Sequence, residues 1–305
     1  MRLRPVIGWA VFIGLSSIIA QALPSPVGTY YFFQGQYFSK KGNYESAAEA
    51  YKKSVDSDPG FDRGYIELGS AYVQLEKYPE AEKQFQQAMK IKEDSCSACG
   101  LGAVYRMEKR NDEAEAMLQK AIKLSPSDSC AYSQLGRLYY DLEKYPLAVD
   151  AFTNLVKLAP TSVNYHFLAL SLFESGRVKD SIEPYRQALK LDQSNAALCI
   201  DLATSYSRLA RYPEAEAALT LAVYAEPDSI KARSFLGVTQ YLRGKTSEAM
   251  EQYHWVLGKD PKIAAEMLKG YKEIAETKNQ MENKRRSLQN EQNQPSQEPA
   301  QKNSR

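Results

Sequence analysis

The chain has 305 residues, and 44% of them are hydrophobic, so it carries enough apolar surface to build packed structure. Its 39 basic and 37 acidic residues leave a net charge of only +2. This balance argues against nucleic acid as the main partner, because surfaces that bind nucleic acid concentrate basic charge.

The N-terminal segment has the pattern of an export signal. Arg2 and Arg4 precede an uncharged apolar run over residues 6–20, and Ala20-Gln21-Ala22 provides the small-x-small pattern that signal peptidase accepts. Extended to Leu23, the run also reaches the ~17–25 residues that can span a bilayer. We therefore expect residues 1–23 to be a signal peptide cleaved after Ala22, or residues 5–23 to be kept as a membrane anchor. Both outcomes place Gly28 onward outside the cytoplasm, periplasmic, secreted or membrane-anchored.

A unit of two helices is clearest in residues 129–161. Apolar and small residues recur at Tyr132, Leu135, Gly136 and Tyr139, the spacing of one helical face. Pro146 suits the first turn of a second helix, where its missing N–H is not needed. The second face is formed by Ala148, Phe152, Leu155 and Val156, and Pro160 ends the unit. Because each helix is apolar on one side only, such a pair must stack on copies of itself.

About seven copies of this unit run through residues 28–263. Small and aromatic residues recur at constant offsets, for example Leu68-Gly69, Leu101-Gly102, Leu135-Gly136 and Leu236-Gly237, followed by Ala81, Ala114, Ala148 and Ala249. The pattern resembles the tetratricopeptide repeat (TPR), whose period is ~34 residues. The resemblance implies an all-α, right-handed α-solenoid of about seven helix-turn-helix repeats. We expect about fifteen helices over residues 28–278, seven pairs and a cap.

The turns inside the pairs follow a second, longer period. Lys77-Tyr78-Pro79, Lys144-Tyr145-Pro146 and Arg211-Tyr212-Pro213 recur in every other repeat. The remaining turns use Gly42, Gly176, Gly244 or the segment 110–112. Glycine ends a helix in the left-handed conformation and proline begins the next helix. Both residues therefore serve to form the turn and do not indicate a catalytic or binding site.

The C-terminal region is expected to close the solenoid. Residues 264–278 show the 3.6-residue apolar period of a capping helix, which a solenoid needs to cover its last apolar face. Beyond them, residues 279–305 are rich in Gln, Asn, Glu and Lys, and we expect a disordered polar tail.

The sequence offers little catalytic chemistry. It has two histidines, His166 and His254, and no Ser-His-Asp, HExxH, GxxxxGK or GxGxxG arrangement. The repeats also leave no block large enough for a catalytic domain. We therefore expect no enzyme, no catalytic residue, no cofactor and no metal site.

Four cysteines remain to be placed. Cys96 and Cys99 form a CxxC on one face of a first helix, and Cys130 has the offset of Cys96 in the next repeat. Adjacent helices pack ~8–10 Å apart, so a Cys99–Cys130 or a Cys96–Cys130 disulfide is sterically feasible, with free thiols as the alternative. Cys199 is expected to be a buried small apolar residue.

The resemblance places ligand binding on the concave wall formed by the first helices. A carboxylate clamp, which binds the C-terminal carboxylate of a peptide, needs Lys and Asn at set positions of consecutive repeats. At the ninth position of the repeat this chain has no Asn; the residues there are Gln36, Ser70, Ala103, Arg137 and Leu170. The extra aromatics Tyr140 and Phe173 each lie one residue past a core position, and aromatic and arginine side chains are enriched at binding hot spots. Any single wall residue has the alternative of being an ordinary exposed side chain. The expected groove residues, centred on repeats four to six, are Arg106, Arg137, Tyr140, His166, Phe173, Arg208 and Tyr241.

These features predict a non-enzymatic scaffold that binds a peptide or protein segment in the groove, outside the cytoplasm. The alternative is an exported protein that recognises an envelope glycan or lipid in an assembly or secretion machine, with Tyr140, Phe173 and Tyr241 stacking on sugar rings.

Overall fold

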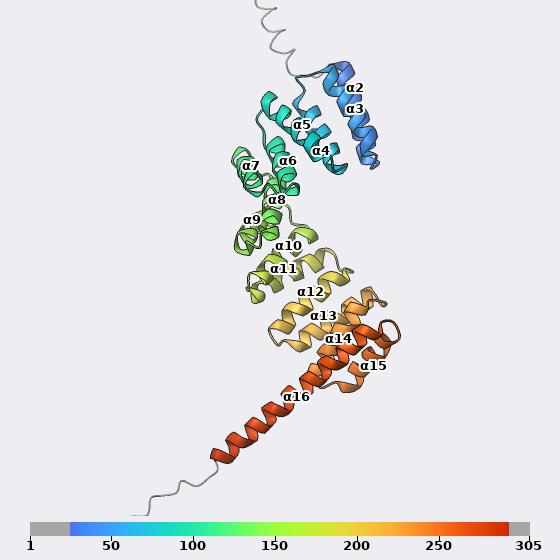
Figure 1. The fold of residues 1–305 in the computed structure, drawn as a ribbon, viewed down its shortest axis with the longest axis vertical. Helices are drawn as coiled ribbons and strands as arrows, with labels where there is room; N and C mark the ends of the chain where they lie inside the picture. Colours follow the sequence, from blue (N-terminus) through green and yellow to red (C-terminus); the bar gives the residue numbers. More distant parts are fainter. Residues whose placement is uncertain (1–24, 293–305) are drawn as a thin grey trace, which may run out of the picture. The chain divides into compact units, whose positions relative to one another are not determined.

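The computed structural model describes residues 25–292 (Figure 1). Within this range the protein has fifteen helices and no strand, which confirms the all-α prediction of seven helix pairs and a final helix. None of these helices combines the length and the apolar character needed to cross a membrane. The segment expected to direct export, residues 1–23, lies outside the described range.

The chain divides into two compact units, residues 1–171 and 172–305. Helix α10, the first helix of repeat 5, contains the division. Repeats 1–4 in unit 1 are the pairs α2 (Pro26–Lys40) and α3 (Tyr44–Ser57), α4 (Asp62–Gln74) and α5 (Tyr78–Ile91), α6 (Ser95–Met107) and α7 (Asn111–Leu124), α8 (Ser129–Asp141) and α9 (Tyr145–Leu158). Repeats 5–7 are α10 (Ser162–Glu174) and α11 (Val178–Leu191), α12 (Ala196–Arg208) and α13 (Tyr212–Ala225), α14 (Ile230–Leu242) and α15 (Thr246–Leu257), followed by α16 (Pro261–Gln292).

Every helix pair is joined by a turn with one left-handed residue. Three turns use glycine, at Gly42, Gly176 and Gly244. The other four use Glu76, Lys109, Glu143 and Ala210, with φ between 56° and 61°. This conformation costs a non-glycine residue roughly 1–2 kcal/mol, so the packing of the two flanking helices must hold these four turns. The sequence predicted a left-handed residue only at the glycines.

The glycine of the Leu-Gly motif makes room for a large side chain from the second helix of its own repeat. A Cβ on Gly102 would lie 2.5 Å from Leu118, and one on Gly136 would lie 2.7 Å from Phe152. Leu118 and Phe152 are fully buried. The recurring glycine is therefore a packing residue, which explains its constant spacing.

In unit 1, tyrosines of first helices also tie consecutive repeats together. The Tyr105 hydroxyl on α6 donates to Glu82 Oε1 on α5 over 3.0 Å, and the Tyr139 hydroxyl on α8 donates to Glu115 Oε1 on α7 over 2.9 Å. The same tyrosines contribute their rings to the core. One residue type thus provides packing inside a repeat and a polar bond to the preceding repeat.

In unit 2, the corresponding link is ionic. Glu216 on α13 accepts from Lys245 Nζ over 2.8 Å and is also paired with the Arg243 guanidinium. Its carboxylate side chain is only 11% exposed. Burial opposes ionisation of Glu216, but the hydrogen bonds from Lys245 and Arg243 outweigh it and hold the pKa below its ordinary value.

The capping helix is longer than the sequence predicted. α16 runs from Pro261 to Gln292 and packs against α14 and α15, with Tyr271 donating to the Ala249 carbonyl over 3.1 Å. The predicted cap ended at residue 278, with a disordered tail from 279, whereas the helix continues to Gln292 (Figure 1). Residues 279–292 contain no Pro or Gly and many good helix formers, which explains the extension. The rest of the predicted tail, residues 293–305, lies outside the described range.

Candidate interaction surface

Arg106, a predicted groove residue in unit 1, links two repeats. It lies on α6 and donates from Nη1 to Asp141 Oδ2 over 2.9 Å and from Nε to Gln134 Oε1 over 3.3 Å, both on α8. Its side chain is 18% exposed. Arg106 therefore holds the first helices of repeats 3 and 4 together while keeping part of its guanidinium at the surface.

Arg137 on α8 is the second predicted arginine of unit 1. Its guanidinium carbon lies 4.6 Å from the ring centroid of Phe167 on α10, a cation–π contact. Its Nε is buried without a hydrogen-bond partner among the described residues. A buried donor without an acceptor costs ~1–3 kcal/mol, so this side chain has unused hydrogen-bonding capacity.

The two remaining predicted residues of unit 1 are half-buried. The Tyr140 ring meets Tyr145 edge-on at 5.5 Å, and the His166 ring stacks near Phe167 at 6.3 Å. Neither is a freely exposed aromatic, so each presents only part of its surface to a ligand.

In unit 2, two predicted residues contact one another. The Arg208 guanidinium carbon lies 5.5 Å from the ring centroid of Phe173, with Arg208 exposed and Phe173 half-buried. The pair combines a cation and an aromatic ring at one place.

Tyr241, the last predicted groove residue, contacts the capping helix. Its ring stacks on Tyr271 of α16 at 4.4 Å with an interplanar angle of 7°, and Lys278 Nζ lies 6.0 Å from its centroid. α16 packs against α14, and Tyr241 is half-buried. Tyr241 therefore packs against the buried cluster of the C-terminal cap with part of its surface exposed.

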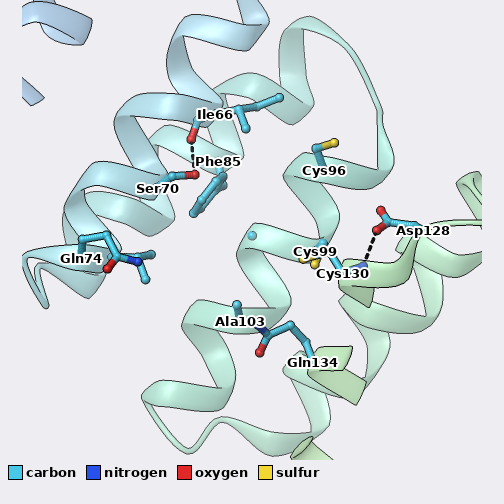
Figure 2. A pocket seen from close by; sticks show the side chains of 12 residues that line it. Ile66, Ser70, Gln74, Phe85, Cys96, Cys99, Ala103, Asp128, Cys130 and Gln134 are labelled. Carbon is cyan, nitrogen blue, oxygen red and sulfur yellow. Dashed lines mark hydrogen bonds between the residues drawn. The ribbon is translucent and has the colours of Figure 1, made fainter. Parts of the chain in front are cut away.

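A cavity on the first helices of unit 1 has a volume of about 360 Å³ (Figure 2). It is called here the unit 1 cavity, and α4, α6 and α8 provide most of its wall. Ile66, Val73, Phe85 and Cys99 give it apolar surface, and Ser70, Gln74, Asp128 and Gln134 provide polar groups around it. Gln134 is also the acceptor for Arg106 Nε, so a guanidinium adjoins the cavity.

Small side chains explain why the cavity lies here. Ser70 and Ala103 occupy equivalent positions of repeats 2 and 3, whereas Arg137 occupies this position in repeat 4. Gly100 adds to the space, and Phe85 closes it from below, lying 2.4 Å from where a Gly100 Cβ would be. The series Ser70, Ala103, Arg137 is visible in the sequence, but its change in side-chain size was not used to predict a cavity.

Unit 2 has its own cavity of about 250 Å³, called here the unit 2 cavity. It lies between first helices α12 and α14 and is more apolar, with few polar groups. Its lining residues are Ala203, Thr204, Ser207, Leu219, Phe235, Val238, Thr239 and Leu242. Phe235, 40% exposed, was not singled out from the sequence.

The seven predicted groove residues do not line these two cavities. Arg106 adjoins the unit 1 cavity through Gln134, and the other six lie elsewhere on their units. The two cavities are lined by other residues, most of them on first helices of the repeats. Among residues 25–292, no three His, Cys, Asp or Glu side chains are grouped to hold a metal ion.

The four cysteines are free thiols, and the structure distinguishes between the two pairings left open by the sequence. Cys99 and Cys199 are buried, and Cys96 and Cys130 are exposed. The thiols of Cys99 and Cys130 are in hydrogen-bonding contact, side by side at the unit 1 cavity (Figure 2). Cys199 is buried, as expected from the sequence.

Comparison with protein families identifies the repeat. Three models, each described as a tetratricopeptide repeat, match residues 32–95 and 133–196, residues 97–128, and residues 172–237. Together these matches span more than half of the chain, and none of the three describes an enzyme.

Curated relatives share only part of their length with this chain. Anaphase-promoting complex subunit 3 of Schizosaccharomyces pombe is 26% identical over 161 residues, which cover 52% of this chain and 23% of the relative. The chain thus spans about a quarter of the length of that protein. A TPR repeat-containing protein of Methanocaldococcus jannaschii is 25% identical to this chain, and the match covers 56% of this chain and 32% of that relative.

Solved structures show the same fold at low identity. The C-terminal part of a TPR repeat-containing protein from Cytophaga hutchinsonii superposes with a TM-score of 0.64 at 17% identity, covering 78% of this chain and 99% of that one. YrrB, described as a TPR protein with an unusual peptide-binding site, gives a TM-score of 0.52 at 19% identity, covering 61% of this chain and 96% of that one. At these identities the likeness establishes the fold alone.

Proposed function

The chain belongs to the tetratricopeptide repeat family, a family of protein-interaction scaffolds, and from this premise we propose that it binds an extended peptide segment along the first helices of unit 1. The observation that carries the proposal is the unit 1 cavity, an apolar hollow of about 360 Å³ with polar groups at its rim. Such a combination suits a ligand with one apolar side chain and a polar backbone.

The spacing of the helices suits an extended ligand. Neighbouring first helices lie ~8–10 Å apart, and an extended peptide advances ~3.3 Å per residue, so about three peptide residues cross each repeat. In the proposed complex, one apolar side chain of the peptide fills the space next to Phe85. The amides of Gln74 and Gln134 can each donate to and accept from the peptide backbone.

Two arginines add charge to the same unit. Arg106 adjoins the cavity through Gln134, and Arg137, on the same helix as Gln134, has a buried Nε without an acceptor. Arginine presents several donors in a fixed plane and forms paired bonds with carboxylates. We therefore infer that the preferred peptide carries an acidic residue near its apolar anchor.

The alternative ligand, an envelope glycan or lipid, has weaker support. It depended on the aromatic faces of Tyr140, Phe173 and Tyr241. Tyr241 stacks on Tyr271, Phe173 contacts Arg208, and Tyr140 contacts Tyr145. Rings that already have neighbours offer less free face for stacking a sugar, so the observations favour a peptide.

The location outside the cytoplasm is also part of the proposal. It is supported by the apolar segment 6–20 and by a row of exposed aromatics on α2, which begins two residues after Pro24. Tyr30, Phe33 and Tyr37 are 60–64% exposed and spaced to share one helical face. Tyrosine and phenylalanine at this distance from an apolar segment suit a membrane–water interface.

Selection from a displayed peptide library against the immobilised full chain tests the binding proposal. We expect enriched peptides to share one apolar residue flanked by an acidic one. The Ala103→Phe variant, which fills the unit 1 cavity, should weaken their binding at least tenfold. Thr204→Phe, which fills the unit 2 cavity instead, is the matched control and should leave binding unchanged.

The proposal fails if no peptide class is enriched, or if Ala103→Phe binds the enriched peptides as tightly as the parent. Topology is tested separately, with a reporter fused after Arg305 that is active only in an oxidising compartment. We expect activity from the fusion. Activity only from a cytoplasmic reporter at the same position would contradict the export proposal and leave the peptide site untouched.

A further inference from the structure

The unit 1 cavity contains a pair of thiols that peptide binding does not use. Cys99 lies on α6 and is 1% exposed, whereas Cys130 lies in the first turn of α8 and is exposed. Their sulfur atoms lie together in Figure 2, while the Cys96 side chain stands apart from them, one turn earlier on α6. Two adjacent repeats thus each bring one thiol to the same point.

We propose that Cys130 and Cys99 form a reactive dithiol, with Cys130 as the attacking and Cys99 as the resolving thiol, that is oxidised to a disulfide by a small disulfide of the glutathione type. The proposal concerns covalent modification of these two residues, and it does not depend on the identity of the groove ligand.

The local structure holds Cys130 in place for this reaction. Asp128 is the N-cap of α8, and its Oδ1 accepts from the backbone N–H of Cys130 over 2.9 Å and of Ala131 over 3.2 Å (Figure 2). This cap fixes the first turn of α8 beside α6. The backbone of Cys130, an exposed residue, is therefore held beside α6, where its sulfur lies next to that of Cys99.

The two thiols have different proton affinities. The hydrogen bond from the Cys99 thiol stabilises the Cys130 thiolate and lowers the pKa of Cys130, against the opposing effects of burial and of the Asp128 charge. The same hydrogen bond, together with burial, raises the pKa of Cys99. For Cys96, burial and the charges of Asp94 and Asp128 raise the pKa. Cys130, the exposed residue of the pair, therefore also has the lower thiol pKa and is the more readily deprotonated to the thiolate that attacks.

The reaction proceeds in two exchange steps. The Cys130 thiolate attacks one sulfur of oxidised glutathione, forming a mixed disulfide and releasing glutathione thiolate. Cys99 then gives its proton to that thiolate, and its sulfur attacks the Cys130 sulfur and expels the second glutathione. Two protein thiols are oxidised to one disulfide while one molecule of oxidised glutathione is reduced to two thiols.

The product would join repeats 3 and 4 covalently at the wall of the unit 1 cavity. A disulfide between α6 and α8 closes the chain around the whole of α7, which restricts the unfolded ensemble. The same residues would remain as thiols in a reducing compartment. The state of the pair therefore reports the compartment in which the chain resides.

The experiment uses the reduced full chain in a series of glutathione redox ratios, quenched with an alkylating reagent and analysed by intact mass and peptide mapping. We expect the chain to lose two alkylatable thiols and about 2 Da, the mass of two hydrogens, with a cross-linked peptide that contains Cys99 and Cys130. Cys96→Ser and Cys199→Ser should behave like the parent.

Two variants separate the roles of the thiols. Cys99→Ser should accumulate a stable glutathione adduct on Cys130, because no resolving thiol remains. Cys130→Ser should leave Cys99 unmodified, because the attacking thiol is gone. A cross-link between Cys96 and Cys130 in the parent, the absence of any cross-link at oxidising ratios, or equal reactivity of Cys130→Ser and the parent would each overturn the proposal. Since the cross-link is mapped in the unmutated chain, the result does not depend on the variants folding.

Discussion

The inner surfaces of the two units differ although the same repeat builds both. Unit 1 presents a cavity of about 360 Å³ with polar rim groups and two thiols, and unit 2 presents one of about 250 Å³ lined mostly by carbon. Both units have polar links between repeats: in unit 1 tyrosine hydroxyls bond to glutamates beside ion pairs such as Arg106–Asp141, and in unit 2 two cations pair with the one carboxylate of Glu216. The residues that define the repeat therefore determine the fold, and a few other first-helix side chains determine what each unit can bind.

The largest expected effect comes from removing the side chain that supports each cavity. Phe85→Ala in unit 1 should cost about 3–5 kcal/mol of stability, because Phe85 is 2% exposed and packs against Gly69 and Gly100. Repeats contact mainly their neighbours, so hydrogen exchange should accelerate in α4–α7 and not in α14–α16.

Leu219→Ala is the matched variant in unit 2, where Leu219 is 1% exposed at the base of the unit 2 cavity. It should cost about 2–5 kcal/mol and accelerate exchange in α12–α15 only. If either variant accelerates exchange evenly along the whole chain, the units are not energetically separate and the comparison between them fails.

A smaller effect is expected at the ionic link of unit 2. Glu216→Gln should destabilise α13 and α14 by about 1.5–3 kcal/mol, the range for hydrogen bonds to charged groups, because the carboxylate is 11% exposed and faces two cations. Urea unfolding measures the change. Glu214→Gln, two residues earlier in an exposed pair with Arg211, is the control and should leave stability nearly unchanged.

Acidification should affect the two units in opposite directions. The lowered pKa of Glu216 means that its stabilisation is present at neutral pH and is lost as the pH falls below the ordinary value of a glutamate. Burial raises the pKa of Glu67 in unit 1, against the opposing charge of Arg63, so folding favours its protonated form and unit 1 gains stability as the pH falls. Glu216→Gln should remove the loss of stability at low pH, and Glu67→Gln should remove the gain of stability at low pH. Urea unfolding over a pH series measures both changes. An unchanged pH profile in both variants would assign the acid response to other groups.

The smallest expected effect tests the neutral links of unit 1. Tyr105→Phe and Tyr139→Phe should each cost about 0.5–1.5 kcal/mol, because each removes one hydroxyl bond to a glutamate and leaves the ring in place. The control is Tyr206→Phe in unit 2, whose ring contacts Arg211 and whose hydroxyl has no hydrogen-bond partner among residues 25–292. Equal losses in all three variants would mean that the ring environment, and not the hydroxyl bond, sets the cost.

The helices were predictable because each depends on nearby residues. Pro146 at the start of a helix, the Leu135-Gly136 pair and the alanine at Ala148 each have a local physical reason, and the structure contains the seven pairs and the cap that they imply. The left-handed Glu143 was not predictable in the same way, because its conformation is held by the packing of two helices and not by its own preference.

The surface was less predictable because it depends on relative sizes across several helices. The cavity near Ala103 follows from three small residues on two helices and a ring beside them. Tyr241 was assigned to the groove by its offset in the repeat, which carries no information on how the capping helix packs. Once α16 lies along α14, Tyr241 has a stacking partner.

The extension of α16 has a mechanical consequence. From residue 279 to residue 289 every side chain is exposed, so this part of the helix continues only because the cap has already formed its first turns. Residues 279–292 add roughly 21 Å at ~1.5 Å per residue. The helix therefore acts as a stiff spacer that keeps anything attached at its far end at a set distance from the last repeat, and heat should shorten this spacer from its free end before it loosens the cap.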